Sequence, residues 1–356
     1  MRFADNRNKI GKYIPAVVFL IFIYGMALWF ILSPKPDYSS SEKRYLQKFP
    51  EVTAEKLLSG DFGSEFETFF ADRFPQRNTW VGLNAYTALA EGNNGASGVY
   101  NCKNGYLINK PVSTENNLDK NIGAVADFAK SIDTPTTVML VPSTGYIVDD
   151  VLPTFHDKYN DDEDISKISS TLSKDKIGFV DLRERFKSEY KNGSQLYYKT
   201  DHHWTTKGAY TGYQELCKAL GITPIDDSTL KKDSYPDFYG TTYSSSGFWL
   251  TPPDNIEIWN NPKNSDRNIS VKITEGANIK TSGSMYFTDH LKEDDKYPVF
   301  IDGNHALTEI TNTNAKNGTI LLIKDSFSHS LAPFLAENYS KVVLVDLRYY
   351  KESVSD

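Results

Sequence analysis

The sequence predicts an α/β protein with a doubly wound, mostly parallel sheet that follows an N-terminal transmembrane helix. Near the N-terminus, a charge-free apolar run is as long as a membrane span. Further along the chain, short runs rich in Val, Ile and Leu alternate with segments of helical apolar spacing. This alternation is typical of buried parallel strands that are joined by crossover helices.

The apolar run is Tyr13–Leu32, which is long enough for a helix to cross a hydrocarbon core of roughly 30 Å. Four basic residues and one acid precede it, so the positive-inside rule places residues 1–12 in the cytoplasm and the chain beyond Ser33 outside. A cleaved signal peptide is the alternative, but the run is longer than a usual signal core and no small-x-small site follows before Pro34. We therefore expect a single-pass protein of the cell membrane with an extracellular main domain.

Residues 33–95 are expected to form a linker and two or three short helices that pack on the main domain. An apolar stripe at helical spacing runs through this segment, and such a stripe is more often core than ligand site. It consists of Leu57, Phe62, Phe66, Phe69, Phe70 and Phe74.

The main α/β domain is expected at 96–356. Its strands are predicted at Thr136–Val141, Ile177–Leu182, Thr319–Lys324 and Lys341–Leu347, and its helices at Leu118–Ile132, Thr206–Leu220 and Ser328–Asn338. Residues 235–302 are rich in Ser, Asn, Asp and Pro and are expected to be a loop-rich insertion with some antiparallel strand. Because open α/β sheets bind ligands at the carboxyl ends of their strands, we expect the site at that edge.

Composition excludes several classes of function. The net charge of -7 and the pI near 5.5 provide no broad basic surface for nucleic acid. Cys102 and Cys217 are too few for a disulfide scaffold or a zinc cluster, so both are expected to be structural, and a bridge between them stays open. No cofactor is expected.

Ser326 is the candidate nucleophile. It lies in KDSFSHS (324–330), after the apolar string TILLI and before a helical pattern. A serine at such a turn lies at the carboxyl edge of a sheet, where N–H groups at the helix start stabilise an oxyanion. The alternative is that Ser326 or Ser328 only caps the helix.

Asp201 and His203 are the candidate acid and base, within YYKTDHHWTT (197–206). If this stretch is extended, Asp201 and His203 share one face and His202 points away. Trp204 is expected to close the site against water. Two alternatives are a surface turn and a metal site that includes His290 or His305; because no second paired motif exists, we expect no metal.

Three strings together resemble the bacterial DHHW family, which is similar to the SGNH-hydrolase-like domain of alginate O-acetyltransferases of the AlgX and AlgJ type. They are TDHHWT (200–205), KDSFSHSLAPFL (324–335) and VVLVDLRYY (342–350), supported by FADRFPQRNTW, NGYLI and VPSTGYIVDDVLP. In those enzymes an Asp-x-His-Trp motif supplies the acid and base, which corresponds to Asp201, His203 and Trp204. The nucleophile there corresponds to Ser326.

The resemblance implies an O-acetyltransferase or acetylesterase that acts on an exopolysaccharide through an acetyl-enzyme at Ser326. It also implies an acetyl donor that is supplied through a membrane-bound O-acyltransferase. The usual glycine before the nucleophile is absent here, so Asn304 is the best side-chain candidate for the oxyanion. The alternative is a noncatalytic polysaccharide-binding or assembly protein, in which aromatic residues stack on glycan. These are Tyr235, Tyr239, Tyr243, Phe248 and Trp249.

Overall fold

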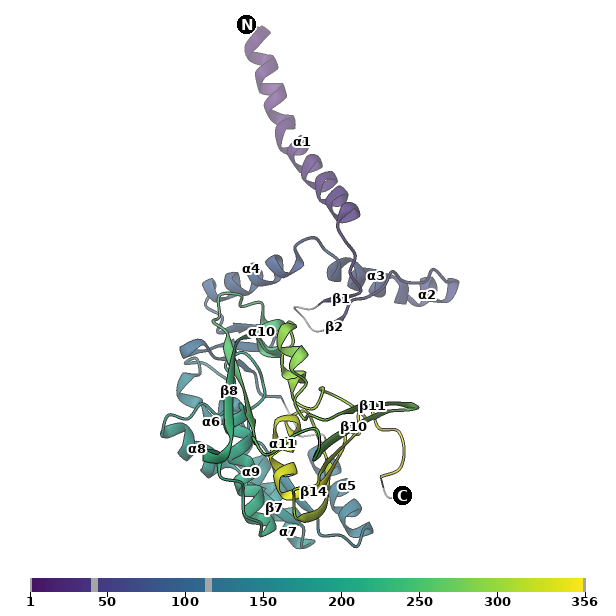
Figure 1. The fold of residues 1–356 in the computed structure, drawn as a ribbon. Helices are drawn as coiled ribbons and strands as arrows, with labels where there is room; N and C mark the ends of the chain where they lie inside the picture. The colour runs from purple at the N-terminus through teal and green to yellow at the C-terminus, as the bar shows by residue number, and fades with distance from the viewer. Residues whose placement is uncertain (1, 40–43, 113–116, 355–356) are drawn as a thin grey trace. The chain divides into compact units, whose positions relative to one another are not determined.

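The computed structural model describes residues 2–39, 44–112 and 117–354 (Figure 1). The chain divides into two compact units, residues 1–84 and 85–356, and each is considered by itself.

Unit 1 contains one long helix and several short elements. They are α1 (Arg2–Leu32), the antiparallel strands β1 (Tyr38–Ser39) and β2 (Arg44–Tyr45), α2 (Ala54–Ser59), α3 (Asp61–Asp72) and most of α4 (Arg77–Ala90). In α1, residues Tyr13–Leu32 have a mean hydropathy of 2.4 and are long and apolar enough to cross a membrane. The expected apolar helix is therefore present, and three short helices follow it.

The apolar stripe of this segment is core only in part: Phe62, Phe69 and Phe74 are half-buried, whereas Leu57, Phe66 and Phe70 are exposed. Phe66 and Phe70 are 40% and 41% exposed, and Asp72 is the one buried residue of α3 in the described chain. The inward side of α3 is polar, because Asp72 accepts hydrogen bonds from Arg44 and from the Gln47 N–H. These charge-assisted bonds turn the phenylalanines outward.

Unit 2 is built on a five-stranded sheet with the order β11-β10-β12-β14-β13. The strands are β10 (Ile269–Glu275), β11 (Asn278–Ser282), β12 (Leu307–Asn312), β13 (Asn317–Ile323) and β14 (Tyr339–Val345). Only the β13–β14 pair of this sheet is parallel among the described strands. Three smaller sheets complete the described strands of unit 2. The first pairs β6 (Thr137–Leu140) with β7 (Gly178–Asp181) in parallel. The second contains the antiparallel strands β3 (Gly95–Ala96), β4 (Val99–Asn101) and β5 (Leu107–Asn109), and the third pairs β8 (Lys231–Phe238) with β9 (Asp254–Asn260) antiparallel.

The expected doubly wound, mostly parallel sheet is therefore replaced by a mixed α/β fold. The four predicted strands form two parallel pairs in separate ladders. The segment 235–302 carries the antiparallel strand that was expected within a loop-rich insertion: it supplies β10 and β11, which turn tightly at Gly276, where φ is 56°. Buried and exposed residues alternate along β10, as they do in antiparallel strands.

The helices of unit 2 are α5 (Leu118–Ser131), α6 (Thr144–Ile147), α7 (Asp161–Lys174), α8 (Arg183–Lys191), α9 (Thr206–Leu220), α10 (Thr241–Ser246) and α11 (Ser328–Asn338). The three helices predicted for unit 2 are present, and the described chain adds α6, α7, α8 and α10, which were not predicted. The bounds of α9 and α11 coincide with the predicted ranges, and α11 connects the parallel strands β13 and β14, beside which it lies (Figure 1). Tyr213 of α9 packs on Phe334 of α11 with ring centroids 5.6 Å apart.

Cys102 and Cys217 are both buried and free, so the bridge left open by the sequence is not formed. Burial raises the pKa of the Cys102 thiol to about 12 and that of Cys217 to about 11, which keeps both thiols protonated and unreactive.

Candidate active site

Residues 197–204 form a tight loop rather than an extended strand. Tyr197 and Trp204 make an antiparallel bridge, and Asp201 to His203 form a bend between them. The Asp201 carboxylate accepts a hydrogen bond from the backbone N–H of His203 at 2.8 Å, a local turn typical of aspartate. The expected extended geometry is therefore wrong, and the bend brings the two side chains together in its place.

A buried carboxylate holds this loop in place. Asp254, at the start of β9, accepts hydrogen bonds from the N–H groups of Lys199 and Thr200 and from the Thr200 hydroxyl. Gln195 donates a further bond to it at 3.1 Å. Burial raises the pKa of Asp254, and these donors act against that rise.

Ser326, His203 and Asp201 form a continuous hydrogen-bonded chain. The Ser326 Oγ lies 2.7 Å from His203 Nε2, and His203 Nδ1 lies 2.5 Å from Asp201 Oδ1. His203 and Asp201 are 5% and 1% exposed, whereas Ser326 is only half-buried. This arrangement is that of a nucleophile, a base and an orienting carboxylate, with the nucleophile open to a substrate.

The second oxygen of Asp201 is fixed by the start of α10. The Thr241 N–H donates to Asp201 Oδ2 at 2.7 Å, and the Thr241 hydroxyl does so at 3.0 Å. Burial by itself raises the pKa of Asp201, but the facing histidine rings and the Thr241 donor outweigh it and hold that pKa well below its usual range. Asp201 is therefore ionised and holds the proton of His203 on Nδ1.

Ser326 lies in the turn between β13 and α11, at the carboxyl end of β13. The Lys324 N–H still pairs with the Val345 carbonyl of β14, and the Asp325 carboxylate accepts from the Phe327 N–H at 3.0 Å. No side chain caps α11 in the described part of the chain. Because its hydroxyl contacts His203, Ser326 is not the helix cap that the sequence left open.

An aromatic cage surrounds the His203 ring. Tyr297 stacks on it with ring centroids 3.9 Å apart and an interplanar angle of 9°, and Phe327 lies 5.0 Å away. The Tyr297 hydroxyl donates to the Ser326 carbonyl at 3.3 Å. Tyr297 was missed by the sequence analysis, since a single tyrosine between two acidic loops forms no pattern.

Trp204 lies beneath this cage instead of closing it from solvent. It is 1% exposed, and its indole N–H donates to the Phe327 carbonyl and to the Ser330 hydroxyl at 3.0 and 2.9 Å. It therefore joins the acid–base loop to the start of α11 and sets the spacing between His203 and Ser326.

His202 does not point away from the site as expected. Its ring stacks on His203 with centroids 3.8 Å apart, and its Nδ1 lies 2.5 Å from the Thr241 hydroxyl. The ligand atoms of Asp201, His202 and His203 lie within 4.8 Å of one another. However, both ring nitrogens of His203 already face Ser326 and Asp201, which favours a proton relay over a metal centre.

The other expected metal ligands lie elsewhere. His290 contacts Asp302 and Glu293. His305 contacts Asp302 and Glu275. No hydrogen bond joins either to the triad among the described residues. Their cluster belongs to the loop that carries Tyr297.

Asn304 and Tyr239 were expected to bind the oxyanion or substrate. Asn304 is exposed, and its amide oxygen accepts from Arg348 at 3.0 Å. Tyr239 is half-buried, with its ring 4.3 Å from that of Tyr243. Neither residue takes part in the hydrogen bonds and ring contacts of the triad described above, so the roles of both stay predictions.

A buried ionic network underlies the serine turn. Lys324 Nζ lies 2.7 Å from His329 Nε2 and 3.1 Å from Asp346 Oδ2, and all three side chains are nearly inaccessible. Burial, with Lys324 nearby, holds the pKa of His329 well below its usual range, so its neutral ring accepts from the ammonium group. The Nδ1 of His329 has no hydrogen-bond partner within the described residues.

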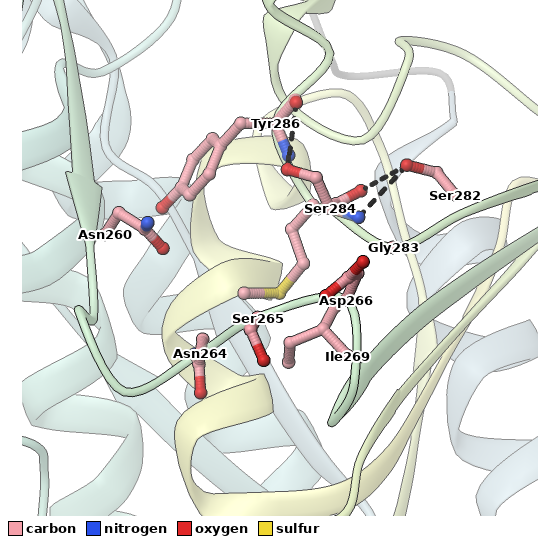
Figure 2. A pocket seen from close by; sticks show the side chains of 10 residues that line it. Asn260, Asn264, Ser265, Asp266, Ile269, Ser282, Gly283, Ser284 and Tyr286 are labelled. Atoms are coloured by element: carbon pink, nitrogen blue, oxygen red, sulfur yellow. Dashed lines mark hydrogen bonds between the residues drawn. The ribbon is translucent and has the colours of Figure 1, made fainter.

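A polar hollow of about 410 Å³ lies on another part of unit 2. Figure 2 shows its lining residues, which come from the ends of β9 and β11, the start of β10 and the connecting turns. They are Asn260, Asn264, Ser265, Asp266, Ile269, Ser282, Gly283, Ser284, Met285 and Tyr286. None of them belongs to the triad.

Comparison with known proteins gave a family and a fold. A model of DHHW proteins matches residues 112–345, and a search of curated proteins gave no match. A DHHW family protein from Eubacterium siraeum is 18% identical, with a TM-score of 0.59 over 72% of this chain and 85% of that chain. Bacillus cereus PatB1 is 21% identical, with a TM-score of 0.57 over 70% and 88%. The O-acetyltransferase domain of Pseudomonas putida AlgJ is 13% identical, with a TM-score of 0.43 over 68% and 78%.

The two likenesses with TM-scores above 0.5 show that this chain shares their fold. The family match covers well over half of the chain and includes the segments that hold Asp201, His203 and Ser326. The chain therefore belongs to the DHHW family.

Proposed function

We propose that this protein is a membrane-anchored, extracytoplasmic serine O-acetyltransferase or acetylesterase that acts on an exopolysaccharide. The observation that carries the proposal is the hydrogen-bonded chain from Ser326 Oγ through His203 to Asp201. Burial of the base and the acid, together with a half-buried nucleophile, fits covalent catalysis at the surface of the fold.

The first half of the reaction forms the acetyl-enzyme. His203 Nε2 takes the proton of Ser326 as the Oγ attacks the carbonyl carbon of an acetyl donor. A negative charge develops on the carbonyl oxygen in this step; the N–H groups of Phe327, Ser328 and His329 are already bonded to Asp325 and Ser326, so the turn into α11 does not offer them to it. When the tetrahedral intermediate collapses, the bond to the leaving group breaks, and the leaving group receives the proton from His203.

The second half releases the acetyl group. A sugar hydroxyl gives its proton to His203 and attacks the acetyl carbon, and the regenerated Ser326 takes the proton back. Water in place of the sugar gives hydrolysis. Asp201, which is ionised, stabilises the imidazolium in both halves.

Two further elements of the proposal rest on the sequence. The resemblance of TDHHWT and KDSFSHSLAPFL to alginate O-acetyltransferases supports an acetyl group and a polysaccharide acceptor. It also supports a membrane-bound O-acyltransferase as the source of the acetyl donor. The apolar helix Tyr13–Leu32, with basic residues before it, supports a single-pass anchor and an outer location of unit 2.

A noncatalytic glycan-binding protein is the second candidate, because one exposed and several half-buried aromatic rings lie together in unit 2, although Phe248 is buried and offers no stacking surface. Trp249 is 40% exposed, with its ring 5.5 Å from that of Tyr86, and Tyr239 packs on Tyr243. Such rings stack on sugars with or without chemistry.

Turnover of a chromogenic acetyl ester, 4-nitrophenyl acetate, separates the two candidates. The enzyme should hydrolyse it, and Ser326→Ala should lower kcat by at least about a thousandfold, because triad members act as a unit. Ser328→Ala is the matched control, since Ser328 is a neighbouring serine at the start of α11. Turnover by the wild type no faster than spontaneous hydrolysis would leave only the binding function, and equal turnover by Ser326→Ala and the wild type above that rate would contradict catalysis by Ser326.

A further inference from the structure

A continuous ridge of phenylalanine rings, the aromatic ridge, extends from the end of α1 along α3. It consists of Phe30, Phe49, Phe62, Phe66, Phe69 and Phe70. Phe30 lies with its ring centroid 4.7 Å from Phe70 and 6.3 Å from Phe69. Phe49 lies 5.4 Å from Phe69 and 6.1 Å from Phe66.

Half of the rings of the aromatic ridge are exposed, and the other three, Phe30, Phe62 and Phe69, are half-buried. Phe49 is 57% exposed, and Phe66 and Phe70 are 40% and 41% exposed. On the neighbouring helix α2, Leu57 and Leu58 are 55% and 90% exposed. Single exposed apolar residues are ordinary, but a contiguous group of large ones marks a surface that another apolar phase covers.

Charged contacts at the C-terminal end of α3 hold the ridge in its direction, and the Arg73 guanidinium also lies over the Phe69 ring, 5.4 Å from its centroid. Arg44 binds the buried Asp72 through both guanidinium nitrogens, and the buried Arg73 donates to the carbonyls of Gln47 and Pro36. Turning the phenylalanines inward would break these charge-assisted bonds and leave buried charges unpaired. The exposure of the ridge is therefore built into unit 1.

The position of Phe30 indicates what covers the ridge. Phe30 lies in the last turn of the apolar segment Tyr13–Leu32, whose end must lie at the boundary between hydrocarbon and headgroups. The residues that contact Phe30, which are Phe69 and Phe70, must lie at the same depth. Aromatic side chains are enriched at this level of a bilayer.

We propose that the aromatic ridge inserts into the outer leaflet of the membrane, so that α3 lies on the bilayer surface as an interfacial helix beside the anchor. This inference rests on the proposed membrane anchoring by α1. It assigns a lipid surface to the ridge, and it explains why a helix with four phenylalanines buries only an aspartate among the described residues.

Spin labels on single introduced cysteines in the full chain, reconstituted into phosphatidylcholine vesicles, test the proposal. A label at Phe66→Cys reports the surroundings of the ridge. A label at Ser64→Cys, an exposed position on the opposite face of α3, is the matched control. Gly25→Cys, where an added side chain meets no atom within 4 Å, reports the middle of the anchor. The native cysteines are buried, so the labelled wild-type chain gives the background.

We expect the labels at positions 25 and 66 to collide more with oxygen than with a water-soluble nickel complex. The oxygen-to-nickel ratio at position 66 should exceed that at position 64 by about threefold or more. If the label at position 66 is as accessible to nickel as the control, or is shielded from both reagents by protein, the lipid assignment is wrong. If the label at position 25 is also open to nickel, the anchor itself fails, which separates the two proposals.

Discussion

The tautomer of His203 is fixed by a single carboxylate. Asp201 accepts from His203 at both the backbone N–H and Nδ1, and Thr241 holds its other oxygen. Nε2 is therefore the nitrogen that faces the Ser326 hydroxyl, in the position that the proposed base requires.

Replacing Asp201 with Asn should lower kcat for 4-nitrophenyl acetate by roughly a thousandfold or more. The amide would present a donor to Nδ1 and favour the tautomer whose Nε2 carries the proton, so that Nε2 no longer accepts from Ser326. Steady-state kinetics measure the effect. A loss of less than about tenfold would show that Asp201 is not the orienting acid.

Tyr297 is expected to position His203 through its ring. Tyr297→Phe keeps the stacked ring and should retain activity within about tenfold, whereas Tyr297→Ala should lower kcat by about a hundredfold with a smaller change in KM. Circular dichroism of both variants controls for folding. Equal losses in the two variants would assign the effect to the hydroxyl instead of the ring.

Acid should remove the stability that Asp346 contributes. Burial raises its pKa, but Arg348 and Lys324 outweigh burial and hold the folded pKa below the unfolded value of about 4. The contribution is therefore present above pH 4 and lost as the pH falls through the folded pKa. The melting temperature of Asp346→Asn should lie well below that of the wild type at pH 6, and the gap should narrow at pH 3. A gap that is independent of pH would contradict this.

The residue types of the triad were predictable because serine after a strand, and Asp-x-His before a helix, are local patterns. Thr241, Gly240 and Tyr297 were not predictable. Each is a single residue in a loop, and only tertiary folding brings them to Asp201 and His203.

At the scale of elements, α9 and α11 were predicted to the residue because their apolar faces repeat with helical spacing. The strand order and the strand directions of the sheet were not predicted, because a run of consecutive apolar residues identifies a buried strand but does not indicate which strand it pairs with or whether the pair is parallel. The bend at Asp201 was also missed, because aspartate and histidine are compatible with both turn and strand.

The junction of β8 and α10 should be intolerant of any side chain at Gly240. A Cβ there would lie 2.1 Å from Asp201 Cβ. Gly240→Ala should therefore lower the free energy of unfolding by about 1 to 3 kcal/mol and reduce kcat, because Asp201 must shift.

Gly123→Ala, in the helix α5, is the control for this change. An added Cβ meets no atom within 4 Å there, so the substitution should be neutral or stabilising by up to about 1 kcal/mol. Urea titration of both variants measures the difference. A Gly240→Ala variant as stable and active as the wild type would show that Asp201 is not closely packed.

At the scale of the whole molecule, the apolar segment of α1 was evident from length and composition alone. The destination of the phenylalanine stripe was not, because helical periodicity identifies an apolar face without indicating whether protein or lipid covers it. The polar contacts of Asp72 and Arg73 decide that question, and they depend on residues far apart in the sequence.

Protease added to intact cells should remove unit 2 and leave a membrane-bound fragment that contains α1. The basic residues before Tyr13 favour an inside N-terminus and an outside main domain. A cytoplasmic protein expressed in the same cells controls for lysis. Protection of unit 2 in intact cells would contradict the proposed orientation.

Covalent labelling of Ser326 by an aryl sulfonyl fluoride, mapped by mass spectrometry of peptides, tests the central claim most directly. The wild type and His202→Gln should carry the label on Ser326, and His203→Ala should lose it, because the His203 Nε2 lies 2.7 Å from the Ser326 Oγ. Absence of label from Ser326, or equal labelling of His203→Ala, would contradict the account.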